Sequence, residues 1–429
     1  MRRMLLGPAS ALVILAAGLA AAQQGVADGP LATLGRTDTA GLIAFVLPGG
    51  RPALVDPSSG ERVMLDERAS GQFPAWSPAG DRVSFITFGA GGEGAGVDVF
   101  DPATGTAARV YERARETPIY HGWSPDGARI AVLANRPGGL GLHLVDARRT
   151  AAEAADGDGE PFAVGAPFYW DWTPSGERLL VHRNVLGPTA ELGLTGLEAF
   201  EPAGTRAAPG AFQSPAVAPS GAWIAYASLD AGGTRRVVLE RVDGVDRGET
   251  FRELPHVGLT AFAWHPRRDQ LALQRPLVDA PHSYGPIALL DAATGDLEAL
   301  TDDVSLAFWW SPDGGTIAYL SPVPAGPGGG ERQVAQRTQA SAPRVALRVV
   351  DVATGLRREL GRVTLSPLFQ NQYLPFFDQY ARSHRLWSPS SDAVVLPVME
   401  GNASVLTVFS LDGGVRVIGA GDMPAWNVR

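Results

Sequence analysis

One short pattern recurs along nearly the whole chain: an aromatic residue, a hydroxyl residue, proline, one further residue and glycine, followed by an apolar run. The copy at 122–134 reads GWSPDGARIAVLA, and the copy at 309–321 reads WWSPDGGTIAYLS. Related copies begin at residues 75, 171, 216, 263 and 386, and a truncated copy, AWNVR, occupies 425–429. A motif repeated at a regular period predicts one repeat architecture rather than several independent domains.

Each copy contains one anchor position, which is tryptophan in all copies except one. The anchors are Trp76, Trp123, Trp172, Val217, Trp264, Trp310, Trp387 and Trp426. Most are 45–49 residues apart, but 77 residues separate Trp310 from Trp387. This period is typical of a four-stranded β-propeller blade. Proline presets φ and glycine accepts a positive φ, so each copy predicts a strand, a tight turn and a second strand.

The residues around the anchors predict how the blades pack. Alanine or glycine precedes the anchor in five of the eight copies, as close packing near a propeller axis requires. Because one tryptophan occurs in almost every blade beside a proline turn, we expect these rings to pack between blades and not to form a ring that stacks on carbohydrate.

A second periodic feature fixes the number of blades. A short apolar run ends in an acidic residue, usually followed by a turn, as in ALLDAATG at 288–295. The acids are Asp56, Asp101, Asp146, Glu201, Asp243, Asp291, Asp351 and Asp412. An aspartate at this place can accept hydrogen bonds from the turn backbone that follows it, so the interpretation is structural. Eight acids and eight anchors predict eight blades.

The two ends of the repeat region complete one blade. Residues 41–47, GLIAFVL, resemble a second strand with no anchor strand before it, and residues 424–429, PAWNVR, resemble an anchor strand with no second strand after it. The sequence therefore predicts an all-β fold over 37–429: an eight-bladed β-propeller of four-stranded blades, closed by a C-terminal strand that joins the N-terminal blade.

The repeated W-S-P-D-G-x-x-I-A, followed by L-x-D-x-A-T-G, resembles the repeat of the TolB-like, or PD40 (WD40-like), β-propeller family over residues 37–429. The resemblance implies a mostly non-catalytic scaffold that binds proteins or small ligands, although the TolB propeller itself has six blades. Similar repeats form the propeller of prolyl-oligopeptidase-like hydrolases. Those enzymes need a serine in a G-x-S-x-G elbow, and this chain has no such pentapeptide.

The N-terminal residues resemble an export signal. Residues 1–22 contain two arginines and an apolar run and end in three consecutive alanines, which predicts a signal peptide, followed by a linker at 23–36. The alternative is an uncleaved membrane anchor. We therefore expect an exported protein, periplasmic or extracellular, that contacts a membrane only if this segment is retained.

Composition excludes several functions. The 36 basic residues are all arginine and there is no cysteine, which excludes lysine Schiff bases, phosphate-loop lysines and thiol chemistry. The formal net charge of −9 argues against nucleic-acid binding. The seven histidines have no metal-ligand spacing, so we expect neither a metal nor a cofactor.

The regular spacing of the anchors is interrupted in blade seven. This interruption indicates a functional surface. Insertions lie at about 322–343 and 366–386, and strand order places both on one face of the propeller. Exposed aromatic residues with arginine are typical of binding surfaces. The predicted binding residues are Tyr373, Phe376, Phe377, Tyr380, Arg382, His384, Arg385, Tyr120, His121, Trp170, Asp171 and Trp309. Two interpretations stay open: the aromatic insertion binds a partner, or it plugs the wide channel of the ring.

From these features we expect a non-catalytic, monomeric scaffold that binds a cell-envelope protein, peptide or glycan through the insertion-bearing face. The alternative is an enzyme, a hydrolase or lyase, that uses His121, His384 and Asp171 in the channel. A third possibility is a purely structural protein with a solvated channel.

Overall fold

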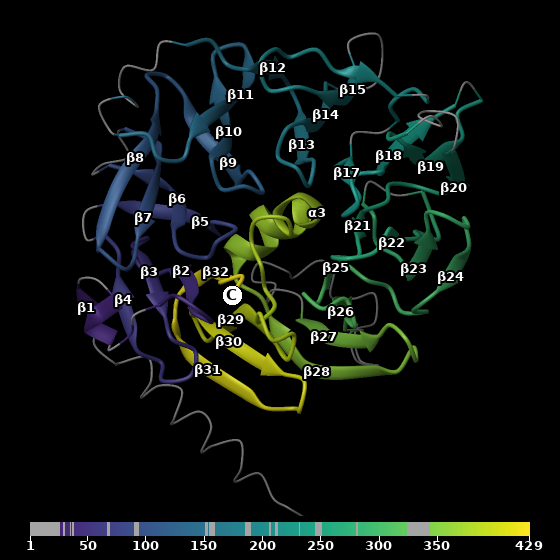
Figure 1. Cartoon of the computed structure of the whole chain (residues 1–429). Helices are drawn as coiled ribbons and strands as arrows, with labels where there is room; N and C mark the ends of the chain where they lie inside the picture. Colours follow the sequence, from purple (N-terminus) through teal and green to yellow (C-terminus); the bar gives the residue numbers. More distant parts are fainter. Residues whose placement is uncertain are drawn as a thin grey trace, which may run out of the picture.

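The computed structural model of the chain describes residues 26–28, 31–34, 36, 38–66, 69–89, 94–150, 153, 159–184, 190–205, 207–210, 213–230, 232–244, 251–279, 282–323 and 344–429. The expected signal peptide and most of the first insertion, 324–343, lie outside these residues. The described strands form eight sheets in a ring (Figure 1), which confirms the predicted eight-bladed propeller. No helix in the described part of the chain is long and apolar enough to cross a membrane.

The blades follow one another in chain order, each with its first strand nearest the axis. Blade 2 comprises β5 (Ser70–Trp76), β6 (Val83–Phe88), β7 (Gly96–Asp101) and β8 (Thr106–Glu112). Blade 3 comprises β9 (Thr117–Trp123), β10 (Arg129–Arg136), β11 (Gly139–Asp146) and β12 (Ala163–Gly165). Blade 4 comprises β13 (Phe168–Trp172), β14 (Leu179–Arg183), β15 (Glu191–Thr195) and β16 (Ala203–Gly204).

The next three blades have the same order. Blade 5 comprises β17 (Ala216–Val217), β18 (Trp223–Leu229), β19 (Arg235–Arg241) and β20 (Phe251–Pro255). Blade 6 comprises β21 (Phe262–Trp264), β22 (Gln270–Gln274), β23 (Ile287–Asp291) and β24 (Leu297–Ala299). Blade 7 comprises β25 (Ala307–Trp310), β26 (Thr316–Pro322), β27 (Arg344–Asp351) and β28 (Arg357–Thr364).

Blades 8 and 1 depart from the four-strand pattern. Blade 8 comprises β29 (Ala393–Glu400), β30 (Ala403–Ser410) and β31 (Val415–Ala420), and its anchor Trp387 pairs with Val394 through a single isolated bridge. Blade 1 comprises β32 (Asp422–Trp426), β2 (Ile43–Val46), β3 (Pro52–Val55), β4 (Arg62–Met64) and an outermost β1 (Val26–Asp28). Strand β1 pairs with β4 in parallel, which the sequence pattern does not predict.

The C-terminal strand closes the ring as predicted. Strand β32 is antiparallel to β2, with Trp426 opposite Ile43 and Ala425 opposite Ala44. The indole N–H of Trp426 also donates to the carbonyl of Gly41 at 2.9 Å. Because this pairing joins the two ends of the repeat region, the innermost strand of blade 1 comes from the far end of the chain.

The repeated turn residues are structural. The Ser124 hydroxyl donates to the Asp126 carboxylate at 2.5 Å and accepts the backbone N–H of Arg129 at 2.9 Å. Gly127 has a φ of +68°, which favours glycine. The acidic residues of the second periodic motif act in the same way, as at Asp291, which accepts the backbone N–H of Thr294 at 2.8 Å. These contacts confirm the turn interpretation of both motifs.

The anchor tryptophans link neighbouring blades through hydrogen bonds. In five cases the indole N–H donates to the carbonyl of the residue before the anchor of the preceding blade. The pairs are Trp76–Ala425, Trp123–Ala75, Trp264–Ala216, Trp310–Ala263 and Trp387–Trp309, at 2.9–3.2 Å. Four of the five acceptors are alanine, and the fifth, Trp309, accepts at a similar distance of 3.1 Å.

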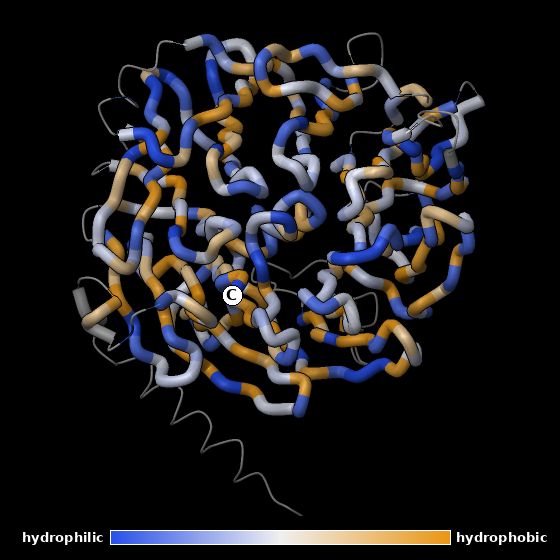
Figure 2. The backbone as a smooth tube through the Cα atoms, in the orientation of Figure 1, coloured by the Kyte–Doolittle hydropathy of each residue, from blue (hydrophilic) through white to orange (hydrophobic). Residues whose placement is uncertain are grey.

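Apolar side chains fill the blades and the spaces between them. Figure 2 shows hydrophobic segments along the strands, with hydrophilic segments among the peripheral turns. Strand β10 is typical, because its five consecutive residues from Ile130 to Ala134 are all buried. Both faces of this strand are therefore packed.

Candidate functional site

The second insertion lies at the centre of the ring, and we call residues 366–386 the plug. It contains a π-helical turn, η4 (Phe369–Tyr373), a 3₁₀ turn, η5 (Leu374–Phe376), and the short helix α3 (Phe377–Tyr380). Figure 1 shows α3 at the centre of the ring, surrounded by the innermost strands. At its start, the Ser366 hydroxyl accepts the backbone N–H of Phe369 at 3.1 Å and donates to Asp422 at 2.9 Å.

Aromatic rings stack from the wall of the ring into the plug. Phe73 of β5 stacks on Tyr380 at 5.1 Å between ring centroids, Tyr380 stacks on Tyr373 at 5.4 Å, and Tyr373 stacks on Phe369 at 4.4 Å. Phe73 has a φ of +53° at an irregularity in the pairing of β5 with β6. Such bulges redirect side chains, and here the strained residue contributes the first ring of the stack.

Gln379 ties the plug to three consecutive blades. Its amide Nε2 donates to the carbonyl of Trp170 at 3.1 Å, and its Oε1 accepts the hydroxyl of Ser214 at 3.1 Å. The hydroxyl of Tyr120 donates to its backbone carbonyl at 3.0 Å. Because buried polar groups are costly to leave unpaired, these bonds fix the position of α3.

Arg382 also joins the plug to the blades, from the segment of the plug that follows α3. Its guanidinium donates to the carbonyls of Trp170 at 3.0 Å and Pro215 at 2.6 Å, and it lies 3.5 Å from the carboxylate of Asp171. The donors of Arg382, one of the predicted binding residues, thus hold the plug against blades 4 and 5.

Asp171 links two blades. Its carboxylate accepts the backbone N–H of Val217 at 2.8 Å. Val217 is the one anchor that is not tryptophan, so blade 5 has no anchor indole to join it to blade 4. Asp171 occupies the position before an anchor, where other blades offer a backbone carbonyl. Its carboxylate therefore supplies an inter-blade hydrogen bond where the indole is missing.

The structure places the twelve predicted binding residues in or around the plug, and most are buried. Eight are buried: Tyr120, His121, Trp170, Trp309, Tyr373, Phe377, Tyr380 and His384. Asp171 and Arg382 are half-buried, whereas Phe376 and Arg385 are exposed. The plugging interpretation thus describes most of the aromatic residues, and only Phe376 and Arg385 offer exposed side chains to a partner.

The two channel histidines, His121 and His384, make structural contacts. His121 Nε2 lies 2.7 Å from the hydroxyl of Ser84, and His384 Nδ1 lies 2.8 Å from the hydroxyl of Ser383. Burial lowers the pKa of His121 to about 4 and that of His384 to about 3, so both are neutral at pH 7. Among the described residues, no cluster of histidine and carboxylate side chains could hold a metal ion.

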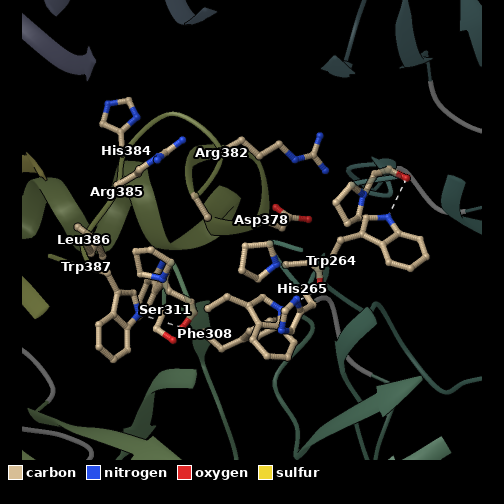
Figure 3. Close-up of a pocket in the computed structure, with 18 of the residues that line it drawn as sticks. Trp264, His265, Phe308, Ser311, Asp378, Arg382, His384, Arg385, Leu386 and Trp387 are labelled. Carbon is tan, nitrogen blue, oxygen red and sulfur yellow. Dashed lines mark hydrogen bonds between the residues drawn. The ribbon is translucent and has the colours of Figure 1, made fainter. Parts of the chain in front are cut away.

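A pocket of about 480 Å³ lies between the plug and blades 4–8 (Figure 3), and we call it the turn-face pocket. Its rim includes Pro219, Pro266 and Pro312, which belong to the repeated turns, so it opens on the face opposite the insertions. Five predicted residues line it: Asp171, Trp309, Arg382, His384 and Arg385.

Charged groups meet in this pocket. Burial raises the pKa of Asp378 to about 6 and also raises that of Asp171, while the charge of Arg382 lowers both. Burial lowers the pKa of Arg385, although its side chain is exposed to the pocket. Among the described residues, no side chain or carbonyl forms a hydrogen bond or ion pair with the Arg385 guanidinium.

A second hollow, about 510 Å³, lies on the insertion-bearing face, and we call it the insertion-face groove. It runs between the plug and blades 2–4. Its apolar lining includes Phe73, Phe88, Ile119, Leu133, Leu140, Phe168, Tyr169, Phe376 and Tyr380, and its polar lining includes Gln72, Thr117, Asn371, Gln372 and Gln379. Phe376 stands at this groove with 45% of its side chain exposed.

Sequence reasoning missed Phe73 and Ser214, which contact the plug. Both lie three residues before an anchor, as do the predicted residues Tyr120 and His384, and Tyr169, which lines the insertion-face groove. The position three residues before an anchor is the signal in the sequence, because each innermost strand faces the axis there. Gln379 and Asp378 have no comparable signal.

No protein-family model and no curated protein sequence matches this chain. The fold is nevertheless shared with solved structures. The dihydro-heme d1 dehydrogenase NirN in complex with DHE is 16% identical, with a TM-score of 0.51 over 93% of this chain and 79% of that one. A prolyl endopeptidase is 12% identical, with a TM-score of 0.52 over 83% of this chain and 50% of that one. TolB from Acinetobacter baumannii is 17% identical, with a TM-score of 0.39 over 92% and 69%.

The chain is a β-propeller by its own strand topology. The solved structures that share this fold include a dehydrogenase and a peptidase, so the fold does not select a function. The function must be argued from the two hollows beside the plug.

Proposed function

We propose that this protein is an exported, non-catalytic scaffold that binds a protein or peptide partner in the cell envelope. The partner binds the insertion-face groove. The observation that carries the proposal is the half-exposed Phe376 beside an apolar groove of about 510 Å³. An exposed aromatic ring next to an apolar hollow is typical of the centre of a protein interface.

The lining of the groove supports a peptide-like partner. Aromatic and aliphatic residues form most of its wall, so apolar side chains of a partner would lose contact with water there. The side-chain amides of Gln72, Asn371 and Gln372 line the same hollow and can pair with the backbone groups of a bound segment.

The burial of the plug supports scaffolding over chemistry in the channel. Tyr373, Phe377 and Tyr380 fill the centre of the ring. Two residues of the enzyme alternative have structural partners, since His121 lies against Ser84 and Asp171 accepts the N–H of Val217. No single observation favours the enzyme alternative.

The test compares Phe376→Asp with Leu356→Asp. Leu356 is a matched control because it is 73% exposed and lies in a turn between β27 and β28, on the opposite face. Each purified variant and the wild type would be cross-linked to an envelope fraction, and the captured proteins quantified by mass spectrometry.

We expect a partner that wild type and Leu356→Asp recover equally and that Phe376→Asp recovers at least about tenfold less, because a charge there would be desolvated. Equal recovery by the two variants would exclude this face. Recovery of a glycan in place of a protein would reject the peptide-like partner.

A further inference from the structure

We propose that the turn-face pocket binds a small carboxylate with an aromatic or apolar body, and that Arg385 receives the carboxylate group. This site lies on the face opposite the insertion-face groove. The proposal therefore does not depend on the protein or peptide partner.

The first observation is the state of Arg385. Its guanidinium is exposed to the pocket, and among the described residues it has no hydrogen-bond or ion-pair partner. The surrounding protein lowers the pKa of this group. The geometry of the guanidinium suits an anion, because its planar fork can form two parallel hydrogen bonds to a carboxylate.

The second observation is that the other charges of the pocket are already engaged. Arg382 donates to two carbonyls and lies 3.5 Å from Asp171. Asp378 accepts the backbone N–H of Gln379 at 3.0 Å. Figure 3 shows Arg385 beside His384 and the guanidinium of Arg382 extending toward the other side of the pocket. Arg385 is therefore the group left to bind an anion.

The third observation is a preorganised aromatic wall. Trp264 and Trp310 line the pocket and are only half-buried. The indole of each is held by a hydrogen bond to the preceding blade, at 3.2 Å and 3.1 Å. Rings that are already fixed lose little freedom when they receive a flat apolar ligand.

The size of the pocket is consistent with this ligand class. Its volume of about 480 Å³ falls in the range of small-molecule sites. A ligand with one carboxylate and one aromatic ring would place its acid on Arg385 and its ring among the tryptophans. A dianion is disfavoured, because Asp171 and Asp378 line the same pocket.

The test uses a matched pair of probes, N-acetyl-tryptophan and N-acetyl-tryptophan amide, which differ only in the carboxylate. Binding to the full protein would be measured by calorimetry and by ligand-observed NMR. We expect the wild type to bind the acid, and to bind the amide at least about tenfold more weakly, as the loss of a charge-assisted hydrogen bond implies.

Three variants locate the site. Arg385→Gln should weaken binding of the acid at least about tenfold and remove the preference for acid over amide. Arg358→Gln removes an exposed arginine of β28 and should bind like the wild type. Phe376→Asp, on the opposite face, should also bind like the wild type.

Three results would overturn the proposal: no binding of the acid by the wild type, equal binding of acid and amide, or equal effects of Arg385→Gln and Arg358→Gln. The acid–amide comparison needs no variant, so it holds even if a substitution disturbs folding.

Discussion

Trp76 donates its indole N–H to the backbone carbonyl of Ala425 at 2.9 Å, across 349 positions of sequence. This bond joins blade 2 to the C-terminal strand of blade 1. It belongs to a series in which an anchor indole contacts the preceding blade, so one repeated sequence feature sets the contact between successive blades.

The first prediction concerns this bond. Trp76→Phe keeps an aromatic ring but leaves the carbonyl of Ala425 without the indole donor. Trp172→Phe is the matched control, because the buried indole N–H of Trp172 has no hydrogen-bond partner among the described residues. We expect Trp76→Phe to lower the free energy of unfolding by about 1 kcal/mol more than Trp172→Phe, measured by chemical denaturation. Equal losses would show that ring packing, and not the hydrogen bond, stabilises the junction.

The second prediction concerns ring closure. Deleting residues 425–429 removes Trp426, which lies opposite Ile43, and exposes the edge of β2. We expect a marked fall in melting temperature and an increased tendency to associate, because an open sheet edge can pair with other chains. An unchanged melting temperature in calorimetry would contradict a stabilising role for closure.

The third prediction separates the buried and exposed faces of the plug. Phe377 is 3% exposed, whereas its neighbour Phe376 is 45% exposed. Phe377→Ala should lower the free energy of unfolding by about 3 kcal/mol or more, since it opens a cavity against Phe308 and Trp309. Phe376→Ala should change it by less than about 1 kcal/mol. If the two variants are equally stable, the plug is not packed as described.

The fourth prediction concerns pH. The folded-state pKa of His121 is about 4, below the ordinary value near 6.5. Between these two pH values, His121 is therefore protonated in the unfolded chain and neutral in the folded chain. The contribution of His121 to the free energy of unfolding is therefore complete above pH 6.5 and is lost as the pH falls toward 4. Asp378, whose pKa is raised to about 6, acts in the opposite direction, so a variant is needed to isolate His121.

His121→Gln removes this proton linkage. Between pH 6.5 and 4, its stability relative to the wild type should improve by about 1.4 kcal/mol for each unit that the pH falls. The measurement is chemical denaturation of both proteins at several pH values. Parallel stability curves would mean that His121 titrates alike in the folded and unfolded chains.

The sequence predicts the fold well because the relevant information is local and repeated. The turn at Ser124–Arg129 and the small residue before five of the eight anchors follow from backbone chemistry that recurs from blade to blade. The closing strand could be predicted because one half-motif stands at each end of the repeat region. Strand β1 could not, since Val26–Asp28 pairs outside the period.

The site was predicted less well, because its geometry depends on contacts between distant segments. The sequence indicated where the plug lies, but it could not show that Tyr373 and Tyr380 stack inward while Phe376 stays exposed. Asp171 was interpreted as a binding residue because it breaks the small-residue rule. Only the structure shows that it compensates for the missing tryptophan at Val217.

The pairing of β2 with β32 also sets the order of assembly. A chain made from its N-terminus has the strands of blade 1 from residue 43 onward, but their innermost partner ends at Trp426. Blade 1 is therefore the last blade to be completed during synthesis, and contacts of such long sequence separation form slowly. Until then β2 has one unpaired edge, which stays open for the whole time the rest of the chain is being made.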